Sequence, residues 1–243
     1  MTSLTDAQLR ELQEVVAWET AMPLPDGRIL GIPGKRGAMT AVRDPRVRLV
    51  IDRLDPEAKT ILEFGCHEGN HTVQLAEVAR EVVAVEVRPK NVAAALVRLW
   101  AHDVRNARIV LKDVREIDER FGAFDILFHV GVLYHLDDPV EHVFRIARMA
   151  PALVLDTHYT TGCVEERRSD LERRGRVYRA CLFDEGGWES SFSGVEPASR
   201  WLFADSLMDL LADAGFHEID VVSDRVERNG PRLTLVAQRR AGS

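Results

Sequence analysis

Residues 61–72, ILEFGCHEGNHT, place an apolar run directly before two glycines and the start of a helical pattern. An apolar strand that enters a glycine turn and then a helix is typical of the ligand-binding edge of an open α/β sheet. Gly65 can take backbone angles that other residues avoid, and Gly69 has no Cβ to obstruct a close approach of the chain to a ligand. We therefore expect a nucleotide-like cofactor at this turn, facing the amides at the start of the helix.

The turn departs from the dinucleotide-binding fingerprint. That pattern has three glycines, and the second makes room for a pyrophosphate. His67 occupies the corresponding position here, and its side chain argues against a diphosphate. S-adenosylmethionine carries an adenosine and a charged methionine part but no phosphate, so the sequence favours it as the cofactor.

Two further carboxylates stand at the ends of predicted strands. The apolar run 82–86 ends in Glu86, and the run 108–112 is followed by Asp113. Glu86 lies at about the distance along the chain at which a ribose-binding acid is found. Its oxygens can accept hydrogen bonds from both ribose hydroxyls, and Asp113 can accept one from the adenine amino group.

With these features in order, the sequence from about Ile61 to Gln238 resembles the class I S-adenosylmethionine-dependent methyltransferases. Residues 124–136, FDILFHVGVLYHL, resemble the family's fourth motif, which passes the methionine part of the cofactor. Within this motif, GVLYH is similar to the wobble-uridine tRNA carboxymethyltransferases, whereas EGNHT at 68–72 is closer to small bacterial methyltransferases of unassigned substrate. The resemblance implies a cofactor-binding set made of Glu63, Gly65, His67, Gly69, Thr72, Glu86, Asp113, Val114 and Val130.

Strands and helices alternate after residue 60, which predicts a parallel sheet with right-handed crossovers. Asn229-Gly230 joins two final strands into a hairpin. The expected fold is α/β, with a Rossmann-like seven-stranded sheet that is mostly parallel, an antiparallel last strand and helices on both faces. Strands are predicted near 60–64, 82–86, 108–112, 125–129, 152–157, 217–223 and 232–238, and helices near 70–79, 90–103, 138–149 and 203–214.

Two domains are predicted. Residues 1–59 form an N-terminal helical appendage or cap, and residues 60–243 form the S-adenosylmethionine-binding methyltransferase domain. In the appendage, a capping box at Thr5 begins one helix, a stretch rich in glycine and proline reaches Met39, and Asp44 caps a second helix.

Residues 159–200 form a long insertion, expected to be irregular and to lie on the substrate side of the sheet. Its aromatic residues suit either an acceptor site or the core of a small subdomain. Within it, residues 165–176 mix Glu, Asp and Arg. That mixture predicts a solvated helix with charge pairs three and four residues apart, rather than a phosphate-binding patch.

Methyl transfer needs alignment of the acceptor, and a base when the acceptor is neutral. His135 is the first candidate base because it follows Tyr134 on the loop after the fourth strand. His158, at the end of the fifth strand, is the second. For both, the alternative is a structural ring that bonds a backbone carbonyl. His129, inside an apolar strand, is expected to be a satisfied buried residue or a wall of the cofactor site.

Tyr134 is the third residue expected at the catalytic site, and it resembles the tyrosine that contacts the cofactor's carboxylate in the tRNA carboxymethyltransferases. The basic amino-terminal portion of those enzymes has no counterpart here, so ordinary S-adenosylmethionine is expected. The net charge of −7 and pI near 5.7 provide no basic field for polyanions, which argues against a nucleic-acid partner.

The longest apolar runs are too short to cross a membrane, and the residues before Leu4 lack a charged and then apolar pattern, so neither a membrane span nor secretion is expected. Cys66, Cys163 and Cys181 lack metal-type spacing, which predicts reduced thiols in a cytoplasm. The acidic residues around Asp138 could suggest a metal site, but Asp138 is explained as the cap of a helix that begins with Pro139. No metal is therefore predicted.

The sequence thus predicts a cytoplasmic enzyme that uses S-adenosylmethionine to methylate an oxygen or nitrogen of a small-molecule acceptor, with a histidine as base. Two alternatives remain open: a tRNA-nucleoside methyl or carboxymethyl transferase, and a cofactor-binding module without turnover. No oligomeric state is predicted.

Overall fold

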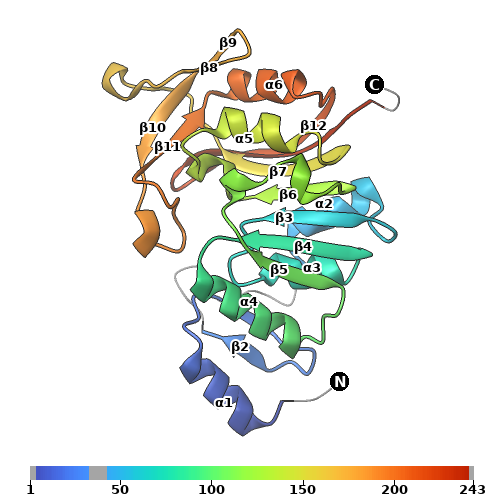
Figure 1. Ribbon diagram of the computed structural model, residues 1–243. Helices are drawn as coiled ribbons and strands as arrows, with labels where there is room; N and C mark the ends of the chain where they lie inside the picture. Colours follow the sequence, from blue (N-terminus) through green and yellow to red (C-terminus); the bar gives the residue numbers. More distant parts are fainter. Residues whose placement is uncertain (1–3, 33–42, 241–243) are drawn as a thin grey trace. The chain divides into compact units, whose positions relative to one another are not determined.

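The computed structural model describes residues 4–32 and 43–240. The chain divides into two compact units, residues 1–114 and 115–243. The main sheet has seven strands in the order β12-β13-β7-β6-β3-β4-β5 (Figure 1). Strands β3 to β5 are parallel to one another, β6 is parallel to β7, and β13 is antiparallel to both of its neighbours. The predicted α/β fold with an antiparallel last strand is confirmed.

The first unit contains the predicted appendage and three strands of the sheet. Thr5 caps α1 in a capping box with Gln8, and Asp44 caps α2 as predicted. Helix α3 packs against both α2 and α4, so these helices form one layer. The stretch 33–39 lies outside the described residues, and the domain boundary after residue 59 stays a prediction. The elements are α1 (Asp6–Val15), β1 (Ala21–Pro23), β2 (Ile29–Gly31), α2 (Pro45–Leu54), β3 (Thr60–Phe64), α3 (Asn70–Ala76), β4 (Glu81–Glu86), α4 (Pro89–Ala101) and β5 (Ala107–Leu111).

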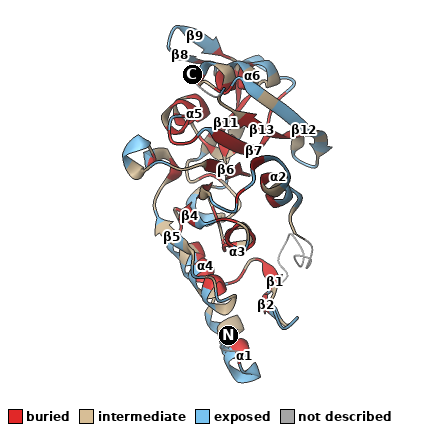
Figure 2. Ribbon diagram, turned by 90° about the vertical axis from the view of Figure 1, so that its right-hand side faces the viewer, coloured by how far each residue is buried: buried red, intermediate tan, exposed pale blue. Residues whose placement is uncertain are grey.

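The second unit contains the other four strands of the sheet. Strands β6 (Ile126–Val130) and β7 (Ala152–His158) are wholly buried, as their continuous apolar runs require. Strand β13 (Gly230–Gln238) is buried too, whereas β12 (Glu218–Glu227) is largely exposed at the sheet edge (Figure 2). Helix α5 (Pro139–Ile146) packs against α6 (Ala204–Asp213).

The insertion is more regular than predicted. It contains η4 (Glu165–Arg167), β8 (Leu171–Arg173), β9 (Arg176–Tyr178), β10 (Ala180–Asp184), η5 (Gly187–Glu189) and β11 (Ala198–Leu202). Strand β8 pairs with β9, and β10 pairs with β11, both antiparallel. Each strand is short, which is why the sequence shows no sustained alternation of apolar and polar residues.

The predicted solvated helix over residues 165–176 is wrong. Most of that segment forms the β8–β9 hairpin, with Arg174 at φ 53° and Gly175 at φ 77°. Two consecutive residues with positive φ make the tight turn that matches the twist of a hairpin, and a helix cannot contain them. The charge pattern alone did not reveal this turn.

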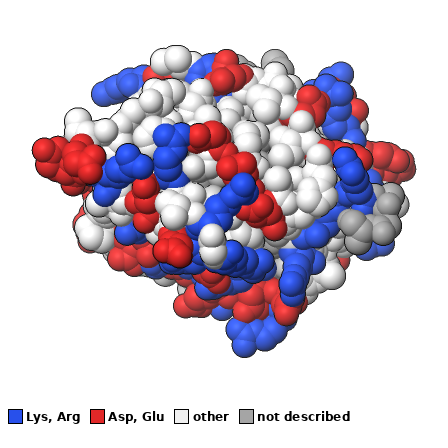
Figure 3. Space-filling view, turned by 90° about the horizontal axis from the view of Figure 1, so that it is seen from above, with Lys and Arg blue, Asp and Glu red and all other residues white. Residues whose placement is uncertain are grey.

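Charges of both signs alternate on the surface of the second unit. In the face shown in Figure 3, Lys and Arg groups lie beside Asp and Glu groups. Several arginines of this unit pair with aspartates, among them Arg176 with Asp213 at 2.6 Å and Arg167 with Asp184 at 2.7 Å. Within the described surface of this face, the pairing leaves no broad field of one sign.

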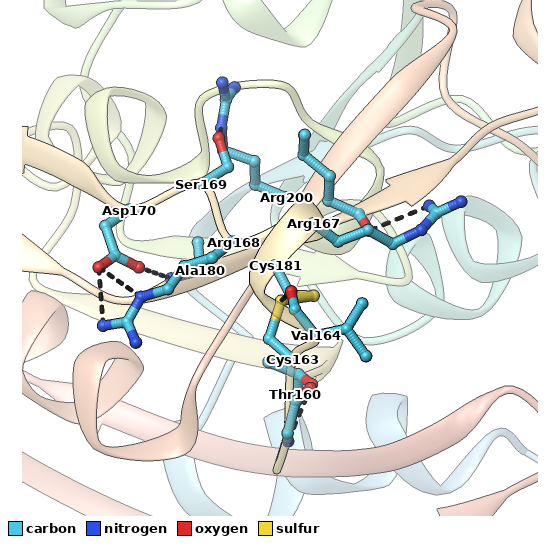
Figure 4. Close-up of a disulfide and its surroundings, with 12 residues drawn as sticks. Thr160, Cys163, Val164, Arg167, Arg168, Ser169, Asp170, Ala180, Cys181 and Arg200 are labelled. Carbon is cyan, nitrogen blue, oxygen red and sulfur yellow. Dashed lines mark hydrogen bonds and ion pairs between the residues drawn. A yellow bond between two sulfur atoms is a disulfide. The ribbon is translucent and has the colours of Figure 1, made fainter.

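Two of the three cysteines are bonded to each other. Cys163 and Cys181 form a disulfide whose Cα atoms are 5.6 Å apart (Figure 4). The prediction of reduced thiols is therefore wrong for this pair, and it holds for Cys66, which is free and buried. The two partners are separated by 18 residues, and only the fold of the insertion brings them together.

In the part of the chain that the structure describes, no helix is long and apolar enough to cross a membrane. The same residues contain no group of three or more His, Cys, Asp or Glu side chains arranged to hold a metal ion.

Candidate functional site: a glycine turn and a histidine–glutamate pair

The glycine turn between β3 and α3 contains three residues in the left-handed region. Gly65 has φ 64°, His67 has φ 52° and Gly69 has φ 79°. Left-handed backbone at a non-glycine residue such as His67 costs about 1–2 kcal/mol. A Cβ added to Gly69 would lie 3.2 Å from the Cβ of Ala95 on α4. The glycine therefore lets the turn pack closely on that helix, and its contact with a cofactor stays a prediction.

Glu86, the last residue of β4, holds the turn in place. Its Oε2 accepts a hydrogen bond from the His67 backbone amide at 3.0 Å, and its Oε1 accepts bonds from the Arg88 amide at 2.9 Å and from Asn91 Nδ2 at 3.3 Å. A carboxylate has about four acceptor sites, so capacity remains for a further donor. Burial raises the pKa of Glu86, against the opposing effect of these bonds.

Glu63, on β3, is buried beneath the same turn. Its Oε2 accepts a hydrogen bond from Thr72 Oγ1 at 2.6 Å, and its Oε1 lies 4.0 Å from His71 Nδ1. Burial raises the pKa of Glu63 to about 7, although His71 and Thr72 act in the opposite direction. Thr72 thus orients a carboxyl group that changes its charge near neutral pH.

This raised pKa predicts a pH-dependent stability. A carboxyl whose pKa is higher in the folded state than its ordinary value of 4.5 stabilises the fold below that value, and the stabilisation is lost as the pH rises through about 7. Relative to Glu63→Gln, the wild type is expected to lose unfolding free energy between about pH 5 and about pH 8, by up to about 1.4 kcal/mol per pH unit. Urea unfolding across this range measures the effect. Glu57→Gln, at an exposed position, is the control, and wild-type and Glu63→Gln curves that stay parallel would contradict the prediction.

Acidic side chains gather where strands β3, β4 and β5 end. Glu63 and Glu86 belong to the parallel strands β3 and β4, and half-buried Asp113 follows β5, so the three carboxylates belong to one edge of the sheet. Val114 continues the chain after Asp113 in a short 3₁₀ turn. These three acidic side chains suit a ligand with a cationic group and repel a diphosphate. It fits S-adenosylmethionine, whose methionine part carries positive charge.

Glu68 connects the appendage to the turn. It is 1% exposed and accepts hydrogen bonds from the backbone amides of Glu19 at 2.6 Å and Thr20 at 2.9 Å. Arg98, also buried, pairs with it at 3.2 Å and donates to its backbone carbonyl at 2.7 Å. No local pattern in the sequence indicates a role for Glu68, because its partner is 48 residues away.

In the second unit, His135 pairs with a glutamate from the insertion. His135 Nδ1 lies 2.9 Å and 3.0 Å from the two carboxylate oxygens of Glu185. Glu185 also accepts hydrogen bonds from Ser193 Oγ and from the Gly194 amide. Sequence reasoning found the histidine and missed the glutamate, since 50 residues separate them.

Aromatic side chains surround this pair. The Tyr134 ring centroid is 4.1 Å from that of His135 and 4.7 Å from that of His158. Trp201 stacks on His158 at 4.8 Å and on Phe183 at 4.0 Å. The structure thus brings together the three residues predicted to be catalytic, Tyr134, His135 and His158, and adds Phe183 from the insertion and Trp201 just after it.

His158 has the contacts of a structural residue. Its Nδ1 lies 3.0 Å from the Pro231 carbonyl oxygen, and its side chain is 1% exposed. Burial lowers its pKa, which favours the neutral ring. His129 is buried, with its Nε2 2.9 Å from that of His142, and burial lowers its pKa to about 4. His135, with 20% of its side chain exposed, is more accessible than either of these rings.

Comparison with known proteins agrees with these observations. A model of the methyltransferase domain family matches residues 61–150. The tRNA U34 carboxymethyltransferase of Shewanella halifaxensis (strain HAW-EB4) is 31% identical over 191 residues, which cover 75% of this chain and 53% of that protein. The same enzyme of Mannheimia succiniciproducens is 27% identical over 189 residues, covering 67% of this chain and 58% of that protein. The chain thus spans a little over half the length of these curated relatives.

Among solved structures, the N-terminal domain of EvdMO1, determined in the presence of S-adenosylhomocysteine and D-fucose, has a TM-score of 0.78 at 26% identity and covers 99% of this chain and 100% of that chain. Magnesium protoporphyrin IX methyltransferase from Synechocystis PCC 6803, with bound S-adenosylmethionine, shares the fold at a TM-score of 0.55 and 18% identity, covering 80% and 76%.

A Rossmann-like sheet with an antiparallel last strand and an acidic glycine turn defines a class I methyltransferase fold. The chain has the fold and the domain of the class I S-adenosylmethionine-dependent methyltransferases, and the prediction of this class is confirmed. Val130 ends β6 in the second unit. The roles of individual residues at the predicted cofactor and catalytic positions stay predictions.

Proposed function

We propose that this protein methylates a hydroxyl oxygen of a small molecule, with His135 as the base. The pairing of His135 Nδ1 with the Glu185 carboxylate carries the proposal. A carboxylate only accepts hydrogen bonds, so Nδ1 holds the ring proton and Nε2 is left with a lone pair. A hydroxyl acceptor of high pKa needs such a base, whereas a neutral amine depends on a base to a smaller extent. The pair therefore favours oxygen over nitrogen.

The first unit is proposed to hold the cofactor. When bound, S-adenosylmethionine supplies a methyl group that is already activated toward a nucleophile. Glu86 would accept from the ribose hydroxyls, Asp113 from the adenine amino group, and the buried Glu63 would offset the positive methionine part. Gly65 and His67 shape the turn that carries these contacts.

A sugar hydroxyl is the proposed acceptor. The solved domain that matches this chain along its whole length was determined with D-fucose present. Tyr134 lies beside His135, and Trp201 and Phe183 continue from it as a row of aromatic rings. Such rings suit the apolar face of a sugar, since pockets for small molecules combine aromatic walls with a few polar groups. A sugar also presents neutral hydroxyls of high pKa, which need the base that His135 provides.

The second candidate is carboxymethyl transfer to tRNA. The names of the curated relatives favour it. Against it stand the net charge of −7 and the mixed charges of Figure 3, since binding to a polyanion rests on basic surface.

Transfer of radiolabelled methyl from S-adenosylmethionine separates the two. The purified protein is incubated with D-fucose, with other 6-deoxyhexoses and their glycosides, and with unmodified tRNA. The same acceptors are tested in parallel with carboxy-S-adenosylmethionine in place of S-adenosylmethionine. Label in a sugar product supports the proposal. Label in tRNA alone, or carboxymethylation alone, overturns it in favour of the second candidate.

A further inference from the structure

Glu185 has the environment of a fixed, charged group. Its side chain is 6% exposed, and three donors converge on its two oxygens: His135 Nδ1, Ser193 Oγ and the Gly194 amide, the last at 2.8 Å. Burial acts to raise its pKa, but these hydrogen bonds and the adjacent imidazole outweigh burial and hold the pKa at about 2. Glu185 is therefore ionised at every pH at which the protein is assayed.

The loop that carries these donors is built to approach His135 closely. A Cβ added to Gly194 would lie 2.5 Å from the His135 carbonyl oxygen, so only glycine fits there without movement. In β11, which follows this loop, the Arg200 amide donates a hydrogen bond to the Leu136 carbonyl at 2.9 Å. The insertion thus lies against the backbone of His135, and its last residue is hydrogen-bonded to the residue that follows the histidine.

We propose that Glu185 is the positioning residue of His135: it keeps the proton on Nδ1 and the lone pair on Nε2, and so makes the insertion part of the catalytic machinery. This inference rests on the proposed function. As the acceptor O–H bond breaks, its proton goes to His135 Nε2, and the oxygen electron pair forms the bond to the methyl carbon. The bond from that carbon to the sulfonium sulfur breaks, its electron pair stays on sulfur, and S-adenosylhomocysteine is the leaving group. The carboxylate then stabilises the positive charge that the ring acquires, as in other histidine–carboxylate pairs.

The test is Glu185→Gln, which keeps the size of the side chain and removes its charge. The glutamine amide can donate to Nδ1 as well as accept from it, so it no longer fixes the tautomer. The ¹⁵N shifts of the His135 ring are expected to report a protonated Nδ1 in the wild type and a loss of that preference in the variant. With a working acceptor, kcat is expected to fall by about 10²- to 10⁴-fold with little change in KM.

Three further variants sharpen the result. Asp184→Asn, one residue away and 80% exposed, is the matched control and is expected to change neither readout. Glu185→Asp is expected to restore part of the tautomer preference. Ser193→Ala removes one donor to Glu185 and is expected to lower kcat by a smaller factor, which keeps the test open if Glu185→Gln fails to fold.

The spectroscopic readout needs no acceptor, so the two proposals fail separately. An unchanged His135 tautomer in Glu185→Gln, or a kcat within about threefold of the wild type, overturns the positioning role. A changed tautomer without methyl transfer to any sugar supports the role of Glu185 and removes the proposed substrate.

Discussion

Replacing His135 by asparagine is expected to lower kcat for methyl transfer by about 10²- to 10⁴-fold while leaving the affinity for S-adenosylhomocysteine unchanged. Asparagine can still donate a hydrogen bond to Glu185, but it has no basic nitrogen near neutral pH. The fall in kcat therefore reports the loss of the group that removes the acceptor proton, and not a change in how the loop packs. Single-turnover transfer of labelled methyl, together with calorimetric titration of the product, measures both quantities.

Two other histidines serve as references for this experiment. His217 is exposed, and His217→Asn is expected to behave as the wild type. His158→Asn removes a buried ring stacked on Trp201. It is therefore expected to lower the free energy of unfolding and to have little effect on kcat for methyl transfer. Activity that survives in His135→Asn and vanishes in a folded His158→Asn would transfer the role of base to His158.

The second large effect concerns stability. Glu68→Ala is expected to lower the free energy of unfolding by about 3–5 kcal/mol, because it leaves the buried guanidinium of Arg98 without its anion. It also removes the acceptor of the Glu19 and Thr20 amides, so the appendage is expected to detach from the glycine turn. Urea unfolding measures the stability, and limited proteolysis detects a released appendage.

Glu77→Ala is the matched control for Glu68. It breaks a pair with Arg43 in which Glu77 is 52% exposed, and such surface pairs contribute about 0–1 kcal/mol. In the double variant Glu68→Met/Arg98→Met, both charges are gone, and stability is expected to recover in part. A Glu68→Ala protein as stable as Glu77→Ala would show that the buried pair does not hold the appendage.

The features that the sequence revealed are those encoded by neighbouring residues. The glycine turn, the capping residues Thr5 and Asp44, and the alternation of strands and helices each depend on contacts within a few positions, and the fold follows from them. Glu86 could be singled out because strand ends of a parallel sheet meet at one edge.

The features that it did not reveal depend on the tertiary fold. Glu185 reaches His135, and Cys163 reaches Cys181, only after the insertion has folded into short hairpins. Those strands are too short to show a period, and the turn at Arg174-Gly175 is hidden in a charged run that resembles a helix. Local patterns carry no information on which distant segments will pair.

The most direct test of the central claim is calorimetric titration of the protein with S-adenosylhomocysteine, repeated with Glu86→Ala. We predict binding of micromolar order in the wild type, weakened by at least about tenfold in the variant, because Glu86 holds the turn through His67 and is proposed to accept from the ribose. NAD, tested in parallel, is expected not to bind. Binding of NAD without binding of S-adenosylhomocysteine would contradict the assignment of this site.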